Sequence, residues 1–366
     1  MSTKRLILGI IMLLVIAATV ACVKSADPRE IPVGALPDAT ATPASITFPR
    51  EELSHDSRLE WWYHSGHLRS ETGKEFGFHF VVFKADDGLG EPNLLAQLGI
   101  LDAETGEHYH VSRAEAGIRS AGDGPLDLGI ANWVYSVEER SGNHQFLAVT
   151  NDLSLSLQLE ATTPVMLHNE IGWLPTETGA TYYYTWPRQS AVGELVINGE
   201  KFSVTGSGWF DHQWGDFFVL GKPAGWQWFA MHLDDGGSMM ITESRGIDGK
   251  IAETYGTYMS AEGDVRHLEH DADGIDLAAL GEWTSAETGG TYPSGWSLIV
   301  ESLGLDLRID PVANDQEIQG GLPAASTYWE GKARISGLQN GLPIGGDAYV
   351  ELSGYVDPEP IDWMQR

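Results

Sequence analysis

The chain has 366 residues, 42% of them hydrophobic, which is enough to bury the cores of two medium domains or one large one. With 52 acidic against 22 basic residues the formal net charge is −30, so phosphate backbones repel the chain and nucleic acid is excluded as a partner. The 13 tryptophans and 43 glycines favour an all-β fold over a helical one.

The first 22 residues are typical of a bacterial lipoprotein signal. Lys4 and Arg5 precede an apolar run over residues 6–20 that is short for a membrane span. Cys22, the one cysteine of the chain, follows and is expected to carry the lipid. Cleavage by ordinary signal peptidase and an uncleaved anchor are the alternatives. Each of the three places the protein outside the cytoplasm, lipid-anchored on the periplasmic side of a membrane or secreted.

Residues 23–46 contain several prolines among alanines and threonines and show no periodicity, which indicates a flexible tether. Beyond it the pattern is strand after strand, and two β-domains are expected, over residues 47–215 and 216–366. The two parts repeat one feature: residues 61–68 and 226–233 each place aromatic side chains before a His-Leu pair.

Several strands are predicted from local patterns. Residues 153–159 alternate leucine with serine or glutamine, which predicts a half-buried antiparallel strand. Residues 195–204 predict a hairpin that turns at Asn198-Gly199. After the signal, the one helical turn that the pattern suggests covers residues 276–281.

The sequence has no zinc-type spacing, no nucleophile elbow and no phosphate loop. His64, His67 and His79 lie on two adjacent predicted strands and could hold a metal if the register brought them together. Histidines satisfied in the core or at its rim are the simpler interpretation, and neither a metal nor a cofactor is predicted.

An acid, an imidazole and two indoles are concentrated between glycines in residues 206–215. Neighbours on a strand face opposite ways, so only one of Asp211 and His212 faces a cavity, and Trp214 shares the face of His212. A buried histidine among aromatic rings can act as a general acid or base, and indole faces stabilise developing positive charge. The alternative is a structural, hydrogen-bonded corner.

Glu60 precedes an apolar strand, and the same choice between a functional and a structural role applies to it. Arg188 is a candidate partner, which would make the two residues a structural ion pair holding the first strand.

Six motifs together resemble the AttH/carotenoid 1,2-hydratase family of lipocalin-like proteins, in order and over residues 55–356. They are Glu60-Trp-Trp-Tyr-His-Ser-Gly-His-Leu68, Tyr182-Tyr-Tyr-Thr-Trp-Pro-Arg188, residues 206–215, residues 226–236, Tyr328-Trp-Glu-Gly331 and residues 346–355.

The resemblance implies two tandem lipocalin-like antiparallel β-barrels with a hydrophobic cavity and no cofactor. It implies that His212 and Trp214 protonate an alkene, with Asp211 orienting the imidazole. The residues then expected to contact ligand are Glu60, Trp61, Tyr63, His79, Tyr184, Arg188, Trp226 and Trp228. Residues 238–244 depart from the family's hydratases, because they lack the expected Tyr and Asp. Glu243 replaces these only if its side chain faces inward.

Together these features predict an extracytoplasmic lipoprotein that binds a hydrophobic, isoprenoid- or lipid-like ligand. Protonation or hydration of a double bond is the expected reaction. The alternative is a non-catalytic accessory or carrier lipoprotein whose partner is a membrane transport system.

Overall fold

The structure is a computed structural model, and it describes residues 43–86, 92–118, 125–138, 140–176, 179–216, 225–246, 248–319 and 327–356. The predicted signal, Cys22 and most of the predicted tether lie outside the described residues. The expected domain limits at residues 47, 215 and 216 stay a prediction.

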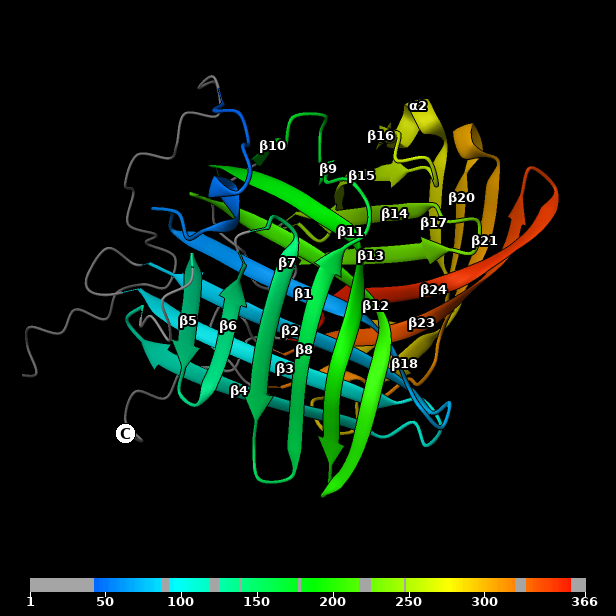
Figure 1. The fold of residues 1–366 in the computed structure, drawn as a ribbon. Helices are drawn as coiled ribbons and strands as arrows, with labels where there is room; N and C mark the ends of the chain where they lie inside the picture. The colour runs from blue at the N-terminus through cyan, green and yellow to red at the C-terminus, as the bar shows by residue number, and fades with distance from the viewer. Residues whose placement is uncertain are drawn as a thin grey trace, which may run out of the picture. The chain divides into compact units, whose positions relative to one another are not determined.

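The described chain is all-β and forms two nearly closed antiparallel barrels, as the sequence predicted (Figure 1). The first barrel is a 12-stranded sheet that starts after the 3-10 turn η1 (Arg50–Glu52). In pairing order its main strands are β4 (His108–Ala116), β3 (Asn93–Asp102), β2 (Glu75–Ala85), β1 (Leu59–Ser70), β12 (Glu200–Asp216), β11 (Gly179–Ile197), β8 (Leu153–Ala161), β7 (Asn143–Val149), β6 (Trp133–Val137) and β5 (Leu126–Ile130). Two short strands, β9 (Met166–Leu167) and β10 (Trp173–Thr176), also pair with β11.

Two local predictions for this barrel are confirmed. The leucines of β8 are buried, whereas Ser156 and Gln158 between them are exposed. β11 and β12 form a hairpin that turns at Asn198 and Gly199, with φ of 51° and 83°. Two successive positive φ angles define the turn type that asparagine followed by glycine favours.

The second barrel is a 10-stranded sheet. In pairing order its main strands are β16 (Val265–Glu269), β15 (Ile251–Met259), β14 (Ser238–Arg245), β13 (Gly225–Leu233), β24 (Leu342–Leu352), β23 (Tyr328–Gln339), β21 (Leu305–Pro311), β20 (Trp296–Val300) and β17 (Ile275–Ala279). The shorter elements are β22 (Glu317–Ile318), which pairs with β23, the separate pair β18 (Glu282–Thr284) and β19 (Thr291–Pro293), and the 3-10 turn η2 (Glu301–Leu303).

The helical turn predicted at residues 276–281 was wrong. Ile275–Ala279 form β17, which pairs with β20, and the helical turn is α2 (His270–Asp273) just before it. Gly274, with a φ of 63°, ends α2 in the left-handed conformation that glycine tolerates best. No helix within the described ranges has the length and apolar character needed to cross a bilayer.

Three apolar clusters hold the described chain together: one inside each barrel, and a third that we call the seam. The seam consists of buried Tyr63, Val81, Leu174, Tyr183, Trp209, Trp228, Ala230, Met240 and Tyr349, with Trp61, Phe83, Trp226 and Tyr255 partly buried against them. Its members come from strands of both barrels. β1 and β12 therefore have two buried faces: Trp62 and Phe210 pack inside the first barrel, while Tyr63 and Trp209 pack in the seam.

Candidate functional site

Strand alternation on β12 separates the two residues at the centre of the sequence prediction. His212 is paired with Trp62 of β1 and lies inside the first barrel, whereas Asp211 is paired with Tyr63 and faces the seam. Asp211 accepts hydrogen bonds from Tyr183 and Trp209. The expected pairing of Asp211 with His212 is therefore not formed, and the two side chains belong to two separate groups of residues.

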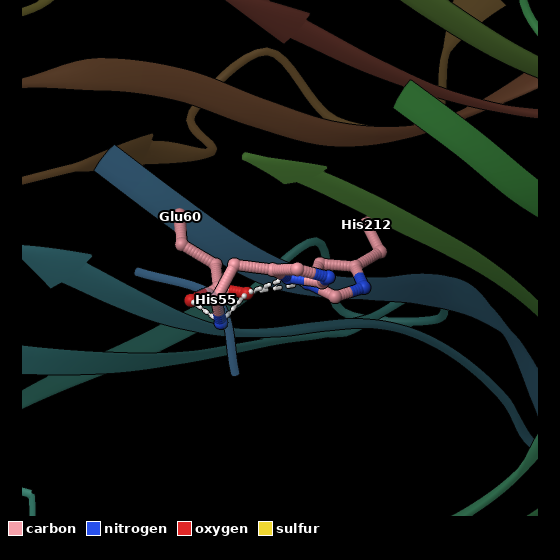
Figure 2. A group of neighbouring side chains, drawn as sticks. All are labelled: His55, Glu60 and His212. Carbon is pink, nitrogen blue, oxygen red and sulfur yellow. Dashed lines mark hydrogen bonds and ion pairs between the residues drawn. The ribbon is translucent and has the colours of Figure 1, made fainter. Parts of the chain in front are cut away.

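Glu60 takes the place expected of Asp211 beside the imidazole. His212 Nε2 lies 3.0 Å from Glu60 Oε1, and His55 Nδ1 lies 2.7 Å from the same oxygen (Figure 2). Lys84 Nζ lies 2.7 Å from the other carboxylate oxygen, and Tyr184 Oη lies 3.2 Å from His212 Nδ1. We call these five residues the Glu60 group.

Trp214 shares the inward face of His212, as predicted, and completes the aromatic surroundings of the group. Its ring is stacked on His55 with centroids 3.9 Å apart and planes 4° apart. The ring of Trp62 is stacked against that of His212, with centroids 5.0 Å apart. Contacts of this kind fix the orientation of both imidazoles.

The charges of the Glu60 group are settled by its hydrogen bonds. Burial alone would raise the pKa of the Glu60 carboxyl, but hydrogen bonds from His212 and His55 and the positive charge of Lys84 outweigh it and hold the pKa well below its usual value. Burial lowers the pKa of His212, although Glu60 partly offsets this. At neutral pH the group therefore contains a carboxylate and a neutral imidazole, and neither is a proton donor to an alkene.

His55, Glu60 and His212 are also the one set among the described residues whose ligand atoms lie close enough together, within 4.8 Å, to hold a metal ion. Each of these atoms is already hydrogen-bonded within the set, and His55 Nε2 additionally lies 2.7 Å from Glu51 Oε2. Because Lys84 balances the carboxylate charge, the set is complete as a hydrogen-bonded ion-pair network.

Arg188 is not the partner of Glu60 that the sequence suggested. It donates to Ser238 Oγ at 2.9 Å and to the carbonyl oxygens of Leu233 and Gly237 at 2.9 and 2.7 Å. The guanidinium thus ties β11 of the first barrel to the β13–β14 turn of the second.

The seam contains three carboxyl groups, which we call the seam acids: Asp211, Glu330 and Glu351. Asp211 accepts hydrogen bonds from Tyr183 Oη at 2.6 Å, from Trp209 Nε1 at 2.9 Å and from Thr185. Glu330 Oε1 accepts one from Tyr63 Oη at 2.6 Å, while its buried Oε2 has no hydrogen-bond partner.

Glu351 lies directly opposite Glu330 across β23 and β24, and opposite Trp228 across β24 and β13. It is the one partly exposed member of the three. The seam acids therefore extend from a fully buried carboxyl to one at the edge of the aromatic cluster.

Burial dominates the proton affinity of the seam acids, because no Lys or Arg appears among the groups that shift Asp211 and Glu330. Burial raises the pKa of Asp211 to about 7, even though its three hydrogen bonds act in the opposite direction. Burial raises the pKa of Glu351 to about 8, and that of Glu330 well above its usual value. All three can carry a proton near neutral pH.

Aromatic rings surround these acids. Trp228 lies edge-on to Tyr63 and Trp209, with centroids 5.3 and 6.1 Å apart, and its indole N–H donates to Tyr183 Oη at 3.0 Å. Trp61 and Trp226 are partly exposed at the edge of the seam. Four of the residues predicted to contact ligand, Trp61, Tyr63, Trp226 and Trp228, are thus brought together here.

A hydrogen-bond chain leads to Asp211 from the second barrel. His168 Nδ1 lies 2.9 Å from Thr257 Oγ1, and His168 Nε2 lies 2.7 Å from Thr185 Oγ1. Because Thr185 gives its proton to Asp211, His168 Nε2 must donate to Thr185 and Nδ1 must accept from Thr257. Burial lowers the pKa of His168 to about 3, which agrees with a neutral ring.

The remaining predicted residues lie elsewhere. Tyr184 belongs to the Glu60 group, inside the first barrel. His64 lies inside that barrel 3.3 Å from His144, whereas His67 contacts Lys332 Nζ at 2.8 Å and His79 faces outward beside Tyr328. His64, His67 and His79 therefore form no common site.

Glu243 faces the interior of the second barrel, where Gln227 Nε2 donates to it at 3.0 Å. Met240, three residues before Glu243 on β14, lies on the opposite face of the strand and faces the seam. Glu243 therefore does not supply the seam with the acid that residues 238–244 lack.

Sequence reasoning missed Glu330, Glu351, His168 and Thr185 as site residues. The two glutamates do lie within motifs that the sequence offered, Tyr328-Trp-Glu-Gly331 and residues 346–355. Their alternation with buried aromatic residues was the signal that could have placed them on one face.

Comparison with known proteins supports the motif resemblance. A family model described as AttH-like matches residues 39–355. No curated protein matches the chain. A candidate AttH protein from Nitrosomonas europaea is 29% identical, with a TM-score of 0.76 over 86% of this chain and 99% of its own.

Kievitone hydratase from Nectria haematococca shares the fold at 19% identity. Its TM-score is 0.70 over 88% of this chain and 98% of its own. The family model covers most of the sequence and includes both barrels, with the Glu60 group and the seam acids inside the matched range. The chain therefore belongs to the AttH-like family.

Proposed function

We propose that the protein binds an apolar, unsaturated ligand of isoprenoid or lipid type against the aromatic seam and protonates one of its double bonds, so that water adds. The observation that carries the proposal is the combination of carboxyl groups whose pKa lies near 7 and 8 with indole rings at the same place. A carboxylic acid that keeps its proton at neutral pH is the donor that an alkene requires.

Each group has a defined role in this reaction. Glu351, the seam acid at the edge of the cluster, gives its proton to one alkene carbon, and the cation forms at the neighbouring carbon. The faces of Trp226 and Trp228 stabilise that charge. Water then attacks the cation and loses a proton to the Glu351 carboxylate, which restores the acid and completes the addition of one water molecule.

Asp211 acts as the second seam acid and is supplied with protons along a defined path. The chain Thr257–His168–Thr185 leads to it in one donating direction. The negative charge of Asp211 also raises the pKa of Glu351, so the two carboxyls are coupled. Asp211 in its ionised state therefore favours a protonated Glu351.

The Glu60 group has a positioning role in this proposal. Its carboxylate and neutral imidazole are unsuited to giving a proton, but they fix β1 and β12, the strands whose other faces carry Tyr63, Trp209 and Asp211. His212 is thus expected to hold β12 in place from the face opposite the seam and to make no contact with ligand.

Kievitone hydratase is, by its name, a hydratase, and the shared fold is consistent with hydration here. The alternative function is that of a carrier that binds an apolar ligand without changing it. That alternative is favoured by β14, which presents Met240 to the seam and carries neither the Tyr nor the Asp expected of a hydratase.

The test separates the two functions. The purified chain is incubated in D₂O with farnesol, squalene or oleic acid, and the products are analysed by mass spectrometry. A hydratase adds one D₂O and leaves deuterium on carbon, and Glu351→Gln lowers the rate by 10²-fold or more while tryptophan quenching by the probe persists. Exposed Glu194→Gln is the matched control and keeps the full rate.

Binding without incorporation of deuterium supports the carrier. A protein that binds none of the three probes contradicts both functions.

Residues 1–22 support a further part of the proposal: an extracytoplasmic, lipid-anchored location through Cys22, with a membrane transport system as the partner if the protein is a carrier. Metabolic labelling with an alkynyl fatty acid tests the anchor. Label that is lost in Cys22→Ala supports it, whereas a wild-type chain without label contradicts it.

A further inference from the structure

A pocket of about 640 Å³ is lined by residues of both barrels and has no role in the function proposed above. The first barrel contributes Leu167, at the end of β9, and Glu170 beyond it. The second barrel contributes residues of β16 and α2: Val265, Arg266, His267, Glu269, Ala272 and Asp273. Leu167 immediately precedes His168, so the pocket borders the chain of hydrogen bonds that leads to Asp211.

His267 connects the pocket to that chain. It lies directly opposite Thr257 across β15 and β16, so the two side chains lie on one face of the sheet. Burial, and after it repulsion from His267, lowers the pKa of His168 to about 3, which places the two imidazoles near each other. His267 is partly exposed, but its buried Nδ1 has no hydrogen-bond partner. Buried polar atoms normally have a partner, so this nitrogen is available to a water molecule from the pocket.

The hydrogen bonds of the chain run in one direction along its whole length. The Thr257 hydroxyl donates to His168 Nδ1, His168 Nε2 donates to Thr185, and Thr185 donates to Asp211. An ionised Asp211 can therefore take the Thr185 proton while each group behind it is refilled from the next. Thr257, His168, Thr185 and Asp211 are all buried, so solvent reaches the series at its His267 end.

The other two donors of Asp211 do not lead to solvent in this way. Trp209 donates an indole N–H, and an indole nitrogen cannot accept a proton in return. Tyr183 Oη accepts from Trp228 Nε1, which is also an indole nitrogen. Protons that travel to Asp211 along the hydrogen bonds of the described residues therefore arrive through Thr185.

The pocket favours positively charged proton carriers. Its lining contains three carboxylates, and its one guanidinium, that of Arg266, is paired with Asp273. Glu253 also interacts electrostatically with His267. Negative charge of this kind raises the local concentration of hydronium and of protonated buffer bases. With about 640 Å³, against about 30 Å³ for a water molecule in the liquid, the pocket admits a small base such as imidazole.

We propose that this pocket is the proton entry of the seam and that His267 takes up protons there for Asp211. Protonated His267 gives its Nδ1 proton, through one water molecule, to the Thr257 hydroxyl. His168 and Thr185 each receive one proton and pass one on, and the Asp211 carboxylate receives the last. One proton has then moved from His267 to Asp211, and a protonated base in the pocket recharges His267. The reverse sequence discharges Asp211 when the medium becomes alkaline.

The test follows the carboxyl proton itself. The full chain in H₂O is mixed rapidly with D₂O at pH 6, below the Asp211 pKa of about 7. The infrared C=O band of protonated Asp211, identified by its absence in Asp211→Asn, is followed as deuterium lowers its frequency. His267→Ala should slow this exchange tenfold or more, and added imidazole should restore most of the rate, because it can take the place of the lost side chain.

Three further variants control the assignment. Thr257→Val interrupts the path beyond the pocket, so exchange should be equally slow and imidazole should not restore it. Thr257→Ser keeps the hydroxyl and should keep the rate within about twofold. His270→Gln changes an exposed histidine of α2 outside the pocket lining and should exchange like the wild type.

Exchange at the wild-type rate in His267→Ala or in Thr257→Val overturns the proposal, and so does imidazole that accelerates both variants equally. A wild type without an Asp211 band at pH 6 overturns it as well, because Asp211 then takes up no proton. The proposal rests on Asp211 as a seam acid and not on turnover of an alkene. Failure of the hydration would appear as absence of deuterium from the probe, whereas failure of the proton entry appears at the Asp211 carboxyl.

Discussion

Glu60 and Asp211 lie on opposite faces of the paired strands β1 and β12, and their carboxyl groups have pKa values shifted in opposite directions. Both carboxyls are buried, and both accept several hydrogen bonds. Glu60 lies beside the ammonium of Lys84 and two imidazoles, and its pKa is depressed, whereas Asp211 has only neutral donors and its pKa rises to about 7. Burial alone therefore does not determine the protonation state of a carboxyl, because the charge of its partners decides it.

The difference in pKa between Glu60 and Asp211 separates a structural role from a chemical one. A carboxylate that is compensated by a cation holds strands together, and one that is not compensated retains a proton that it can give away. The proton donation that we propose therefore belongs to the seam rather than to the acid–imidazole pair in the Glu60 group. Variants that alter Glu60 or Asp211, or the partners of either carboxyl, test this comparison one side at a time.

The largest effect is expected from Lys84→Met, which leaves the Glu60 carboxylate buried without its cation. We expect the free energy of unfolding to fall by about 3–5 kcal/mol in urea denaturation at pH 7. The matched control is Lys201→Met, which breaks an exposed pair with Glu194 and should change stability by less than about 1 kcal/mol. Equal effects of the two variants would show that the Glu60 charge does not need Lys84.

The pH dependence of stability should have opposite signs for the two carboxyls. The folded pKa of Asp211 is raised, so between its unfolded pKa of 3.8 and about 7 the native state holds a proton that the unfolded state has lost. Stability from this group therefore falls as pH rises through that window, by at most about 1.4 kcal/mol per pH unit. Asp211→Asn should flatten the profile there and be relatively more stable at pH 8.

The folded pKa of Glu60 is depressed, so its contribution is present above its unfolded pKa and is lost as pH falls below about 4. Glu60→Gln should therefore change the acid limb of the profile and leave the slope between pH 5 and 7 as it is. Urea midpoints measured from pH 3 to pH 9 for both variants test the assignment. If the slope of stability against pH between pH 5 and 7 disappears in Glu60→Gln and not in Asp211→Asn, the assignment of that slope to Asp211 is wrong.

A smaller effect is expected where the hydrogen-bond chain meets Asp211. Thr185→Val removes one donor from Asp211 and leaves His168 Nε2–H without an acceptor, so unfolding should become easier by about 1–3 kcal/mol. The loss should grow as pH rises from 5 to 8, because the ionised carboxylate needs the donor most. Val192→Thr, at an exposed position of the same strand, controls for the exchange of valine and threonine.

The sequence predicted the strands and their pairing better than it predicted the site. Residues 153–159 and Asn198-Gly199 carry local signals, and these need no knowledge of the tertiary fold. The alternation of Asp211 and His212 was also visible, but the sequence could not show that a second barrel would bury the Asp211 face. Glu330 and Glu351 lie more than 100 residues from Asp211, so their meeting depends on the packing of two barrels and not on any local pattern.

The smallest effect is expected when two adjacent tyrosines of β11 are replaced one at a time. The hydroxyl of one belongs to the seam, and that of the other belongs to the Glu60 group. Tyr183 donates to Asp211, and Tyr184 lies 3.2 Å from His212. Each change to phenylalanine should lower stability by about 1 kcal/mol at pH 5. At pH 8 Tyr183→Phe should lose about 1 kcal/mol more, because an ionised Asp211 has then lost a strong donor. Tyr184→Phe should show no such extra loss at pH 8, because burial lowers the pKa of His212 and its partner there is a neutral imidazole rather than a carboxylate. Parallel urea titrations of the two variants at both pH values measure the difference, and identical pH responses would contradict the separation of the seam from the Glu60 group.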